Sequence, residues 1–308
     1  MLLIVIESNG SSPGKPGFKM VVAEDGNLFG TIGGGPTEFN LVSLAQRKIR
    51  EASEDNFLKH EIHQSDAAEN RSGLICSGEQ WVAFYPLTSK NKELAGDIAH
   101  ANENNIHGLI TFNHEGIHFR KGEEKHHSHK NPVTSESEWE YSEPTGLANS
   151  IYIFGAGHVG FALSKIMHQL GFVIHLFDDR KKLTTMKDNT FADFKEVVDF
   201  RSVSELIPEG ENIFVVIMTF GHKSDEVVLR QMLSKKIKYL GLMGSSRKVE
   251  KIFSNLREDG FQQESLSNID APIGLSIGSQ TADEIAVSIA AKIIKVKNKN
   301  PVIITTQN

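Results

Sequence analysis

The feature that most constrains the fold is a glycine-rich turn between a buried strand and an amphipathic helix. Residues 151–154 form an apolar run typical of a fully buried strand, and Gly155-Ala-Gly-His-Val-Gly160 follows at once. Beyond the turn, apolar residues recur at three- and four-residue spacing from Val159 to Leu170, which predicts one buried face of a helix. This strand–turn–helix order is the pattern of dinucleotide-binding folds, so we expect such a fold to begin near residue 150.

The rest of the C-terminal half agrees with that expectation. Further strand patterns cover residues 172–177, 213–218 and 239–242, and the last two precede helix patterns. Strands that alternate with helices are typical of a parallel, doubly wound sheet. Thr281 and Glu284 form a capping-box pattern that starts the final helix. The expected fold class of this half is therefore α/β, with a Rossmann-like doubly wound parallel sheet.

The N-terminal half mixes short β-rich runs with two helix patterns. The expected strands cover residues 2–7, 19–24, 28–32, 57–63 and 80–86, with a strand pair over 107–119, and the expected helices cover 36–52 and 91–104. Asp25-Gly26, between the second and third runs, is typical of a hairpin turn. We therefore expect an α+β domain in this half.

Length and local composition suggest where the chain divides. A chain of 308 residues suggests two domains. Because residues 121–130 are all polar or glycine, we expect a linker there. The expected divisions are 1–120 for the N-terminal domain, 121–149 for the linker, 150–296 for the Rossmann-like domain and 297–308 for a C-terminal tail. The linker histidines His126, His127 and His129 resemble a metal-binding tract, but their spacing favours a solvated linker, so we assign no metal site.

Composition limits the partners and the compartment. The net charge of −6 argues against a nucleic-acid partner. A single cysteine excludes a disulfide within the chain and fits a reducing compartment. The apolar run at residues 2–6 lacks the basic leader of a signal peptide, and no run approaches the length of a membrane helix. We therefore expect a cytoplasmic protein without a membrane partner.

The glycine turn suggests an anion site. The first glycine permits the tight turn, the second lets a phosphate approach the backbone, and the third lets the helix pack close to the strand. The start of the helix offers unpaired N–H groups to an anion, and an acid after the second strand can accept a hydrogen bond from a ligand hydroxyl. The candidate ligand-binding residues are Gly155, Gly157, His158, Gly160, Asp178 and Asp179. The alternative is that the glycines serve only packing.

Two more strand ends are expected at the same edge of the sheet, where ligands bind in such folds. Thr219 follows the strand over 213–218. Gly244, Ser245 and Arg247 follow the strand over 239–242, and Arg247 can bind a phosphate with two parallel hydrogen bonds. The alternative for Arg247 is an ordinary surface residue.

Two groups stand out in the N-terminal half. Gly33, Gly34 and Gly35 are consecutive glycines before a helix, and because glycine is entropically costly, something must approach the backbone closely there. Either a ligand or another element of the fold satisfies this requirement. Cys76 is either a sulfur carrier or molybdenum ligand, because thiolates are soft ligands, or a small packing residue.

Several of these motifs, taken together and in order, resemble the xanthine dehydrogenase accessory factor family (XdhC/CoxI). The matching segments are 7–13, 30–35, 154–160, 178–180, 241–248, 271–275 and 284–291. The chain departs from the family pattern at two places: Pro36 stands where many relatives carry cysteine, and Thr219-Phe-Gly-His222 stands where relatives often have Thr-His-Asp-His.

The resemblance implies an accessory factor or chaperone without turnover of its own. Such proteins bind molybdenum cofactor in its molybdopterin form as cargo. They assist its sulfuration together with a cysteine desulfurase, and its insertion into a xanthine dehydrogenase-type molybdoenzyme. Two alternatives stay open: an NAD(P)-dependent oxidoreductase, and a nucleotide-binding protein without chemistry of its own. The sequence also leaves open whether NAD(P) binds and whether the chain forms a homodimer.

Overall fold

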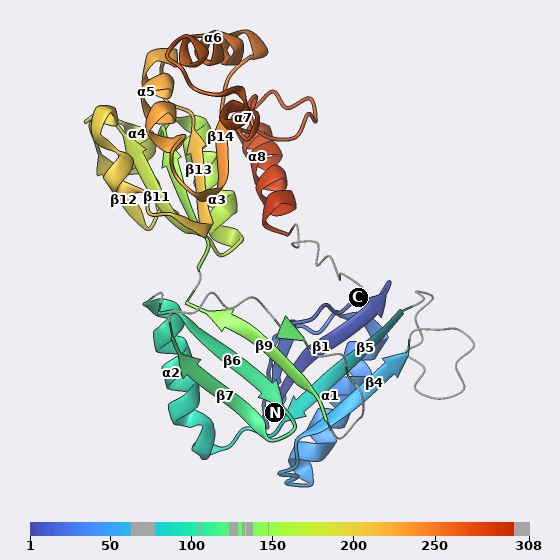
Figure 1. The fold of residues 1–308 in the computed structure, drawn as a ribbon. Helices are drawn as coiled ribbons and strands as arrows, with labels where there is room; N and C mark the ends of the chain where they lie inside the picture. The colour runs from blue at the N-terminus through green and yellow to red at the C-terminus, as the bar shows by residue number, and fades with distance from the viewer. Residues whose placement is uncertain are drawn as a thin grey trace. The chain divides into compact units, whose positions relative to one another are not determined.

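The computed structural model of the protein describes residues 1–62, 78–104, 106–122, 129–130, 133, 138–146 and 148–298. The chain divides into two compact units, Met1–Leu147 and Ala148–Asn308 (Figure 1). Cys76, His126 and His127 lie outside the described residues, and of His129 only the backbone is described. Within the described part of the chain, no helix combines the length and the apolar character that a membrane crossing requires.

The first unit contains two antiparallel sheets and two long helices. Helix α1 lies between β3 and β4 in the sequence, and α2 lies between β5 and β6. One sheet has the strand order β3-β2-β1-β5-β4 and the other the order β7-β6-β9-β8. The strands are β1 (Leu2–Gly10), β2 (Lys19–Val22), β3 (Leu28–Gly30), β4 (Phe57–Ile62), β5 (Gly78–Tyr85), β6 (Gly108–Asn113), β7 (Gly116–Lys121), β8 (His129–Lys130) and β9 (Glu140–Thr145). The helices are α1 (Gly35–Arg50), the short 3₁₀ turn η1 (Ser89–Asn91) and α2 (Lys92–Glu103).

Strand β1 is apolar on both faces because both faces are covered. Leu3 and Val5 pack in one core with Leu41 of α1. Ile4 and Ile6 pack in a second core that includes residues of β6 and β9. Alternate side chains of a strand point to opposite faces, so the continuous apolar run of β1 supplies both cores.

The predicted linker over 121–149 is wrong for part of its length. Residues 140–145 form β9, which pairs antiparallel with the whole of β6. Tyr141 on this strand is buried against Phe112 of β6. The strand was not predicted because the residues before it are polar and its partner, β6, is distant in the sequence. Residues 140–145 therefore belong to the first unit.

The second unit is the doubly wound parallel sheet that the sequence predicts. All strand pairs are parallel, in the order β12-β11-β10-β13-β14. The strands are β10 (Ser150–Phe154), β11 (Val173–Asp178), β12 (Phe194–Val197), β13 (Gly210–Ile217) and β14 (Ile237–Leu242). The helices are α3 (His158–Gln169), α4 (Thr184–Lys187), η2 (Phe200–Ser202), η3 (Ser204–Leu206), α5 (His222–Met232), α6 (Ser246–Glu258), α7 (Gln263–Ser267) and α8 (Ala282–Lys297).

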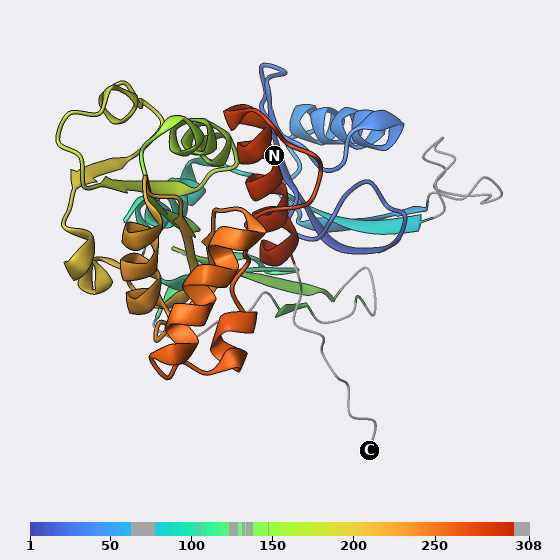
Figure 2. The ribbon, with the colours of Figure 1, turned by 90° about the horizontal axis from the view of Figure 1, so that it is seen from above.

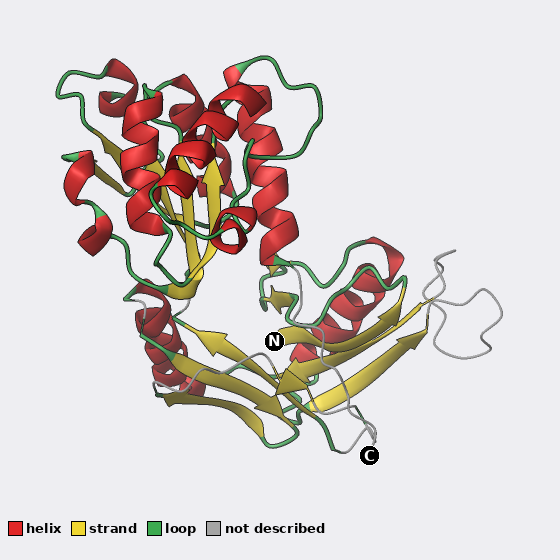
Figure 3. Cartoon of the chain, turned by 45° about the horizontal axis from the view of Figure 1, so that its top comes forward, coloured by secondary structure: helices red, strands yellow, loops and turns green. Residues whose placement is uncertain are grey.

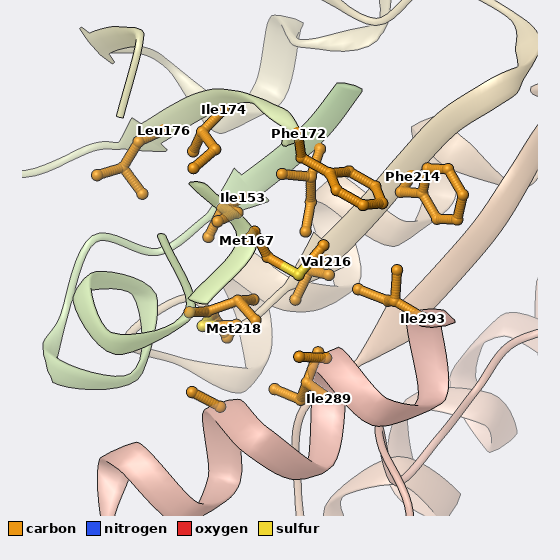
Figure 4. Packing of buried hydrophobic residues seen from close by; sticks show 14 of the residues in the cluster. Ile153, Met167, Phe172, Ile174, Leu176, Phe214, Val216, Met218, Ile289 and Ile293 are labelled. Carbon is orange, nitrogen blue, oxygen red and sulfur yellow. The ribbon is translucent and has the colours of Figure 1, made fainter. Parts of the chain in front are cut away.

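Helices cover both faces of this sheet (Figure 3). On one face, Ile153 of β10 packs with Met167 of α3 and Ile289 of α8, and Figure 4 shows these side chains meeting around Val216 of β13. Helices α3 and α8 lie side by side on this face (Figure 2). Burying a side chain the size of Ile153 stabilises the fold by about 1.5–3 kcal/mol.

The opposite face carries a second core. Phe154 of β10 packs there in one cluster with residues of α5 and α6, including Leu229 and Ile252. The chain reverses its direction of winding between β10 and β13, so α3 and α5 leave the sheet toward opposite faces. In folds of this kind, that reversal leaves a crevice at the carboxyl ends of the two strands.

The turn after β10 is held by close backbone packing at Gly155. The φ of Gly155 is +120°, and a Cβ added there would lie 2.2 Å from the carbonyl oxygen of Met218. The Gly155 N–H donates to the carbonyl oxygen of Phe177 at 2.8 Å, and the Met218 N–H donates to that of Phe154 at 2.8 Å. The loop is thereby fixed to both neighbouring strands.

Gly155→Ala is expected to lower the free energy of unfolding by about 2 kcal/mol or more, because both the backbone conformation and the added methyl group are unfavourable. Gly157→Ala is the matched control, since a Cβ at Gly157 meets nothing within 4 Å among the described residues. That variant should lower stability by about 1 kcal/mol or less, because alanine is a poorer N-cap residue than glycine. Urea unfolding of both variants measures the difference, and equal stabilities would contradict the packing role of Gly155.

Candidate functional site

The start of α3 is the open part of the glycine turn. Gly157 is the N-cap residue of α3, and no side chain caps the first turn within the described chain. A Cβ at Gly160 would lie 2.1 Å from the carbonyl oxygen of Gly155, so this glycine lets the helix pack on the turn. His158 is exposed in the first turn. Uncapped N–H groups at a helix start carry partial positive charge and suit an anion.

Asp178, at the end of β11, is held inside the protein. Its side chain is 1% exposed, and its carboxylate accepts four hydrogen bonds. One comes from the Ala156 N–H at 2.8 Å, and three come from Arg180: its backbone N–H at 3.1 Å, Nε at 2.7 Å and Nη2 at 2.7 Å. The carboxylate therefore holds the glycine turn, whereas the neighbouring Asp179 is exposed.

The partners of Asp178 also set its protonation. Burial alone would raise the pKa of Asp178, but the hydrogen bonds from Arg180 and Ala156 outweigh that effect, and the net pKa lies below its usual value. The carboxylate is thus charged at neutral pH, and its interaction with Arg180 is a charge-assisted, two-pronged pair.

Arg180 reaches from Asp178 toward an exposed aromatic ring. Its guanidinium carbon lies 5.3 Å from the ring centroid of Phe220, which follows β13 and is 87% exposed. Strand β10 lies between β11 and β13 in the sheet, so the pair spans the carboxyl end of β10. An exposed ring beside a cation offers a flat apolar face to a planar ligand. The sequence approach did not select either residue as a ligand contact.

Thr219 is engaged within the protein. Both its N–H, at 2.8 Å, and its hydroxyl, at 2.7 Å, donate to one carboxylate oxygen of Asp225. The other oxygen of Asp225 pairs with the ammonium of Lys248, and the Asp225 side chain is fully buried. This network joins the end of β13 to the first turns of α5 and α6. An acid in the first turn of a helix is the signal that could have identified Asp225.

The start of α6, directly after the turn that follows β14, is capped by the side chain of Ser245. The Ser245 hydroxyl accepts a hydrogen bond from the Lys248 N–H at 3.3 Å. A Cβ at Gly244 would lie 2.8 Å from Cδ of Lys248, so this glycine makes room for the lysine. Arg247 is exposed in the first turn of α6. Ser245 therefore satisfies one of the N–H groups at the helix start that was expected to contact a ligand.

In the first unit, the half-buried carboxylate of Glu38 binds the loop that holds the consecutive glycines. Oε2 of Glu38 accepts hydrogen bonds from the Thr31 hydroxyl at 2.6 Å, the Ile32 N–H at 2.9 Å and the Gly34 N–H at 3.0 Å. These bonds hold the pKa of Glu38 below its usual value although burial opposes them. Glu38 of α1 thus satisfies the amides of Ile32 and Gly34, and the Gly33 N–H donates to the Thr31 hydroxyl at 3.1 Å.

The close approach expected at the consecutive glycines is made at Gly33 by another element of the fold. Its φ is +125°, and a Cβ there would lie 2.5 Å from the backbone nitrogen of Gly14. Gly34, the N-cap of α1, has open space beside it, and Gly35 is the first residue of that helix. The structure therefore favours a packing role at Gly33.

Across the described ranges, no group of three or more His, Cys, Asp or Glu side chains is placed to hold a metal ion.

Two protein-family models together match most of the chain. Residues 151–293 match the family model of the XdhC Rossmann domain. Residues 1–59 match the model of the XdhC and CoxI family. The second match covers the start of the first unit, and the first match covers most of the second unit.

Individual relatives are distant but extend over large parts of the chain. The chain is 25% identical over 301 residues, 96% of its length and 43% of the relative's, to the uncharacterized protein YqeB of Escherichia coli K12. It is 25% identical over 158 residues, 50% of its length and 44% of the relative's, to a probable xanthine dehydrogenase subunit of Bacillus subtilis 168. The chain thus spans less than half the length of these curated relatives.

A solved structure shares the fold. It is the crystal structure of a Bacillus halodurans protein described as a xanthine dehydrogenase, with a TM-score of 0.77 and 22% sequence identity. The match covers 99% of this chain and 93% of that protein. At this identity the likeness shows the fold alone.

The Asp178 pair generates a pH-dependent prediction. Asp178→Asn should lower the free energy of unfolding at pH 7 by about 1–3 kcal/mol, because Arg180 and Ala156 lose a charged acceptor. The folded pKa of Asp178 is depressed, so its contribution is complete above the unfolded pKa of about 3.9 and is lost as pH falls through the folded pKa.

The difference between wild type and Asp178→Asn should therefore shrink below about pH 4. Urea unfolding at a series of pH values measures it. The control is Asp179→Asn at the exposed neighbour, which should stay within about 0.5 kcal/mol of wild type. A pH-independent difference would contradict the role of the Asp178 charge.

Proposed function

Because the chain belongs to the XdhC and CoxI family, we propose that it is an accessory factor for molybdenum cofactor. It binds the cofactor as cargo in the crevice at the carboxyl ends of β10 and β13, supports its sulfuration, and passes it to a xanthine dehydrogenase-type molybdoenzyme in the cytoplasm. The observation that carries this proposal is the uncapped start of α3 at Gly157, with open space beside the glycine.

The residues present fit such a cargo in two respects. Molybdopterin carries a phosphate, and the free N–H groups at the start of α3 suit that anion. It also carries a planar ring system, and the exposed Phe220 beside the Arg180 guanidinium offers a flat face for it. Asp178 holds Arg180 and the glycine turn in fixed positions, so the crevice needs little reorganisation when the cargo binds.

The partners follow from the family and from one relative. The Bacillus subtilis relative, described as a probable xanthine dehydrogenase subunit, supports a partner of the xanthine dehydrogenase type. Sulfuration requires a sulfur donor, for which a cysteine desulfurase is the partner of the appropriate chemistry. In this proposal the thiol of Cys76 carries sulfur to molybdenum or ligates it, because a thiolate is a soft ligand.

An oxidoreductase that uses NAD, whose ribose carries a free 2′-hydroxyl, has less support. Its ribose hydroxyl is normally held by the acid at the end of the second strand. Here that acid, Asp178, accepts four hydrogen bonds from Ala156 and Arg180 and is buried. Mass analysis of small molecules released from the purified protein separates the two proposals, since a pterin supports the accessory factor and a nicotinamide nucleotide supports the oxidoreductase.

Gly157→Asp should abolish retention of the pterin cofactor through purification. A carboxylate placed at the start of α3 repels the phosphate and occupies the space beside Gly157. The fold should persist, because a Cβ at Gly157 meets no described atom within 4 Å. Pterin released from equal amounts of protein, quantified by fluorescence after oxidation, measures retention.

The control is Gly96→Asp in α2, a glycine of the first unit with equally open surroundings. It should retain cofactor as the wild type does. Retention by Gly157→Asp at the wild-type level would place the cofactor outside this crevice.

Cys76→Ser should impair sulfuration of the cofactor without loss of folding, since a hydroxyl neither carries sulfur nor ligates molybdenum as a thiolate does. The readout is the activity of the co-expressed xanthine dehydrogenase-type client, together with its release of thiocyanate on cyanide treatment, which reports the terminal sulfur. Unchanged client activity would reduce Cys76 to a packing residue.

A further inference from the structure

A basic pocket of about 450 Å³ lies beside the glycine turn of the second unit. Five of its nine lining residues are cationic and none is acidic; the cations are Arg180, Lys181, Lys182, Lys187 and Lys195. They come from the loop after β11, from α4 and from β12. So many cations in one concave site of a chain with net charge −6 indicate an anionic ligand.

The pocket is joined to the glycine turn through Ala156. On one side, the Ala156 N–H donates to Asp178, whose carboxylate also holds Arg180 on the pocket wall. On the other side, the hydroxyl of Thr185 in α4 donates to the carbonyl oxygen of Ala156. The segment that lines the pocket is therefore hydrogen-bonded at two points to the residue between Gly155 and Gly157.

Two of the five cations are hydrogen-bonded within the protein, and two others are exposed to solvent and available to a ligand. The Lys195 ammonium donates to the carbonyl oxygens of Asn189 at 2.9 Å and Lys187 at 3.3 Å, and Arg180 is bound to Asp178. Lys181 and Lys182 are exposed, and in the described part of the chain no carboxylate forms an ion pair with either. Asp179, the acid nearest in the sequence, does not line the pocket.

The position of the pocket suggests which anion it takes. In dinucleotide-binding folds, the end of the second strand faces the ribose, where an acid selects a free 2′-hydroxyl and a nearby arginine accommodates a 2′-phosphate. Here the carboxylate of Asp178 is turned inward, and Arg180, Lys181 and Lys182 follow it directly.

We propose that this pocket binds a phosphate on the ribose of a nucleotide whose 5′-phosphate lies at the start of α3. The inference rests on the proposed function only in using the same crevice. It adds a second anion position, and it assigns to the crevice a class of ligand, ribose-phosphorylated nucleotides, that the pterin cargo does not represent.

The test is isothermal titration of the full chain, freed of bound small molecules, with adenosine 2′,5′-bisphosphate and with adenosine 5′-monophosphate. The wild type should bind the bisphosphate about tenfold more tightly or better, as expected for a phosphate that gains charge-assisted hydrogen bonds. The preference should fall as salt is raised, because these lysines are exposed.

Lys181→Gln combined with Lys182→Gln should reduce the preference to less than about threefold and leave the affinity for the monophosphate unchanged. The control is Lys251→Gln combined with Lys295→Gln, which removes the same charge from exposed positions of α6 and α8 that do not line the pocket. That control should keep the wild-type preference.

Equal affinity of the wild type for the two nucleotides, or binding of neither, would overturn the inference, as would a preference that survives in the Lys181/Lys182 variant. Loss of pterin retention by that variant without any nucleotide preference in the wild type would also overturn it, by assigning the pocket to the phosphate of the cargo. Pterin retention by wild type and Gly157→Asp tests the proposed function separately, so the two failures are distinguishable.

Discussion

The buried carboxylate of Asp178 is the interaction that fixes the glycine turn of the second unit. It accepts the Ala156 N–H of the glycine turn and three N–H groups of Arg180, so one side chain joins β11, the turn after β10 and a cation at the edge of the sheet. A buried carboxylate without such partners would be strongly unfavourable. The hydrogen bonds to Asp178 fix the Arg180 side chain. In this position its guanidinium contacts the Phe220 ring, and the residue also lines the basic pocket.

Two glycine-rich turns precede helices in this chain, and their surroundings separate their roles. At the start of α1, the carboxylate of Glu38 accepts the N–H groups of Ile32 and Gly34, and the backbone near Gly14 approaches Gly33. At the start of α3, no side chain within the described residues takes the corresponding place beside Gly157. Both N-cap glycines have open space beside them, but two amides of the loop before α1 are bonded to Glu38, whereas no described side chain bonds an amide at the start of α3.

Local patterns predict the second unit well because its strands and helices are regular and continuous. The buried run over 151–154, the glycine turn and the capping box at Thr281 all appear in the structure where the sequence places them. Strand β9 was not predicted, because it is fixed by pairing with β6 and not by its own composition. Strand β12 was also missed, since its four residues are all exposed. The side chain of Asp178 is buried because of the strand face on which it lies and because it pairs with Arg180. The sequence does not show which of the two adjacent acids, Asp178 or Asp179, is the buried one.

The most direct measurement is a crystal structure of the full chain with bound molybdenum cofactor. The account predicts the cofactor phosphate within hydrogen-bond distance of the backbone N–H groups in the first turn of α3, with the ring system against Phe220 and Arg180. A phosphate bound elsewhere, or a Phe220 ring folded over Gly157 so that no space is left beside it, would contradict the account.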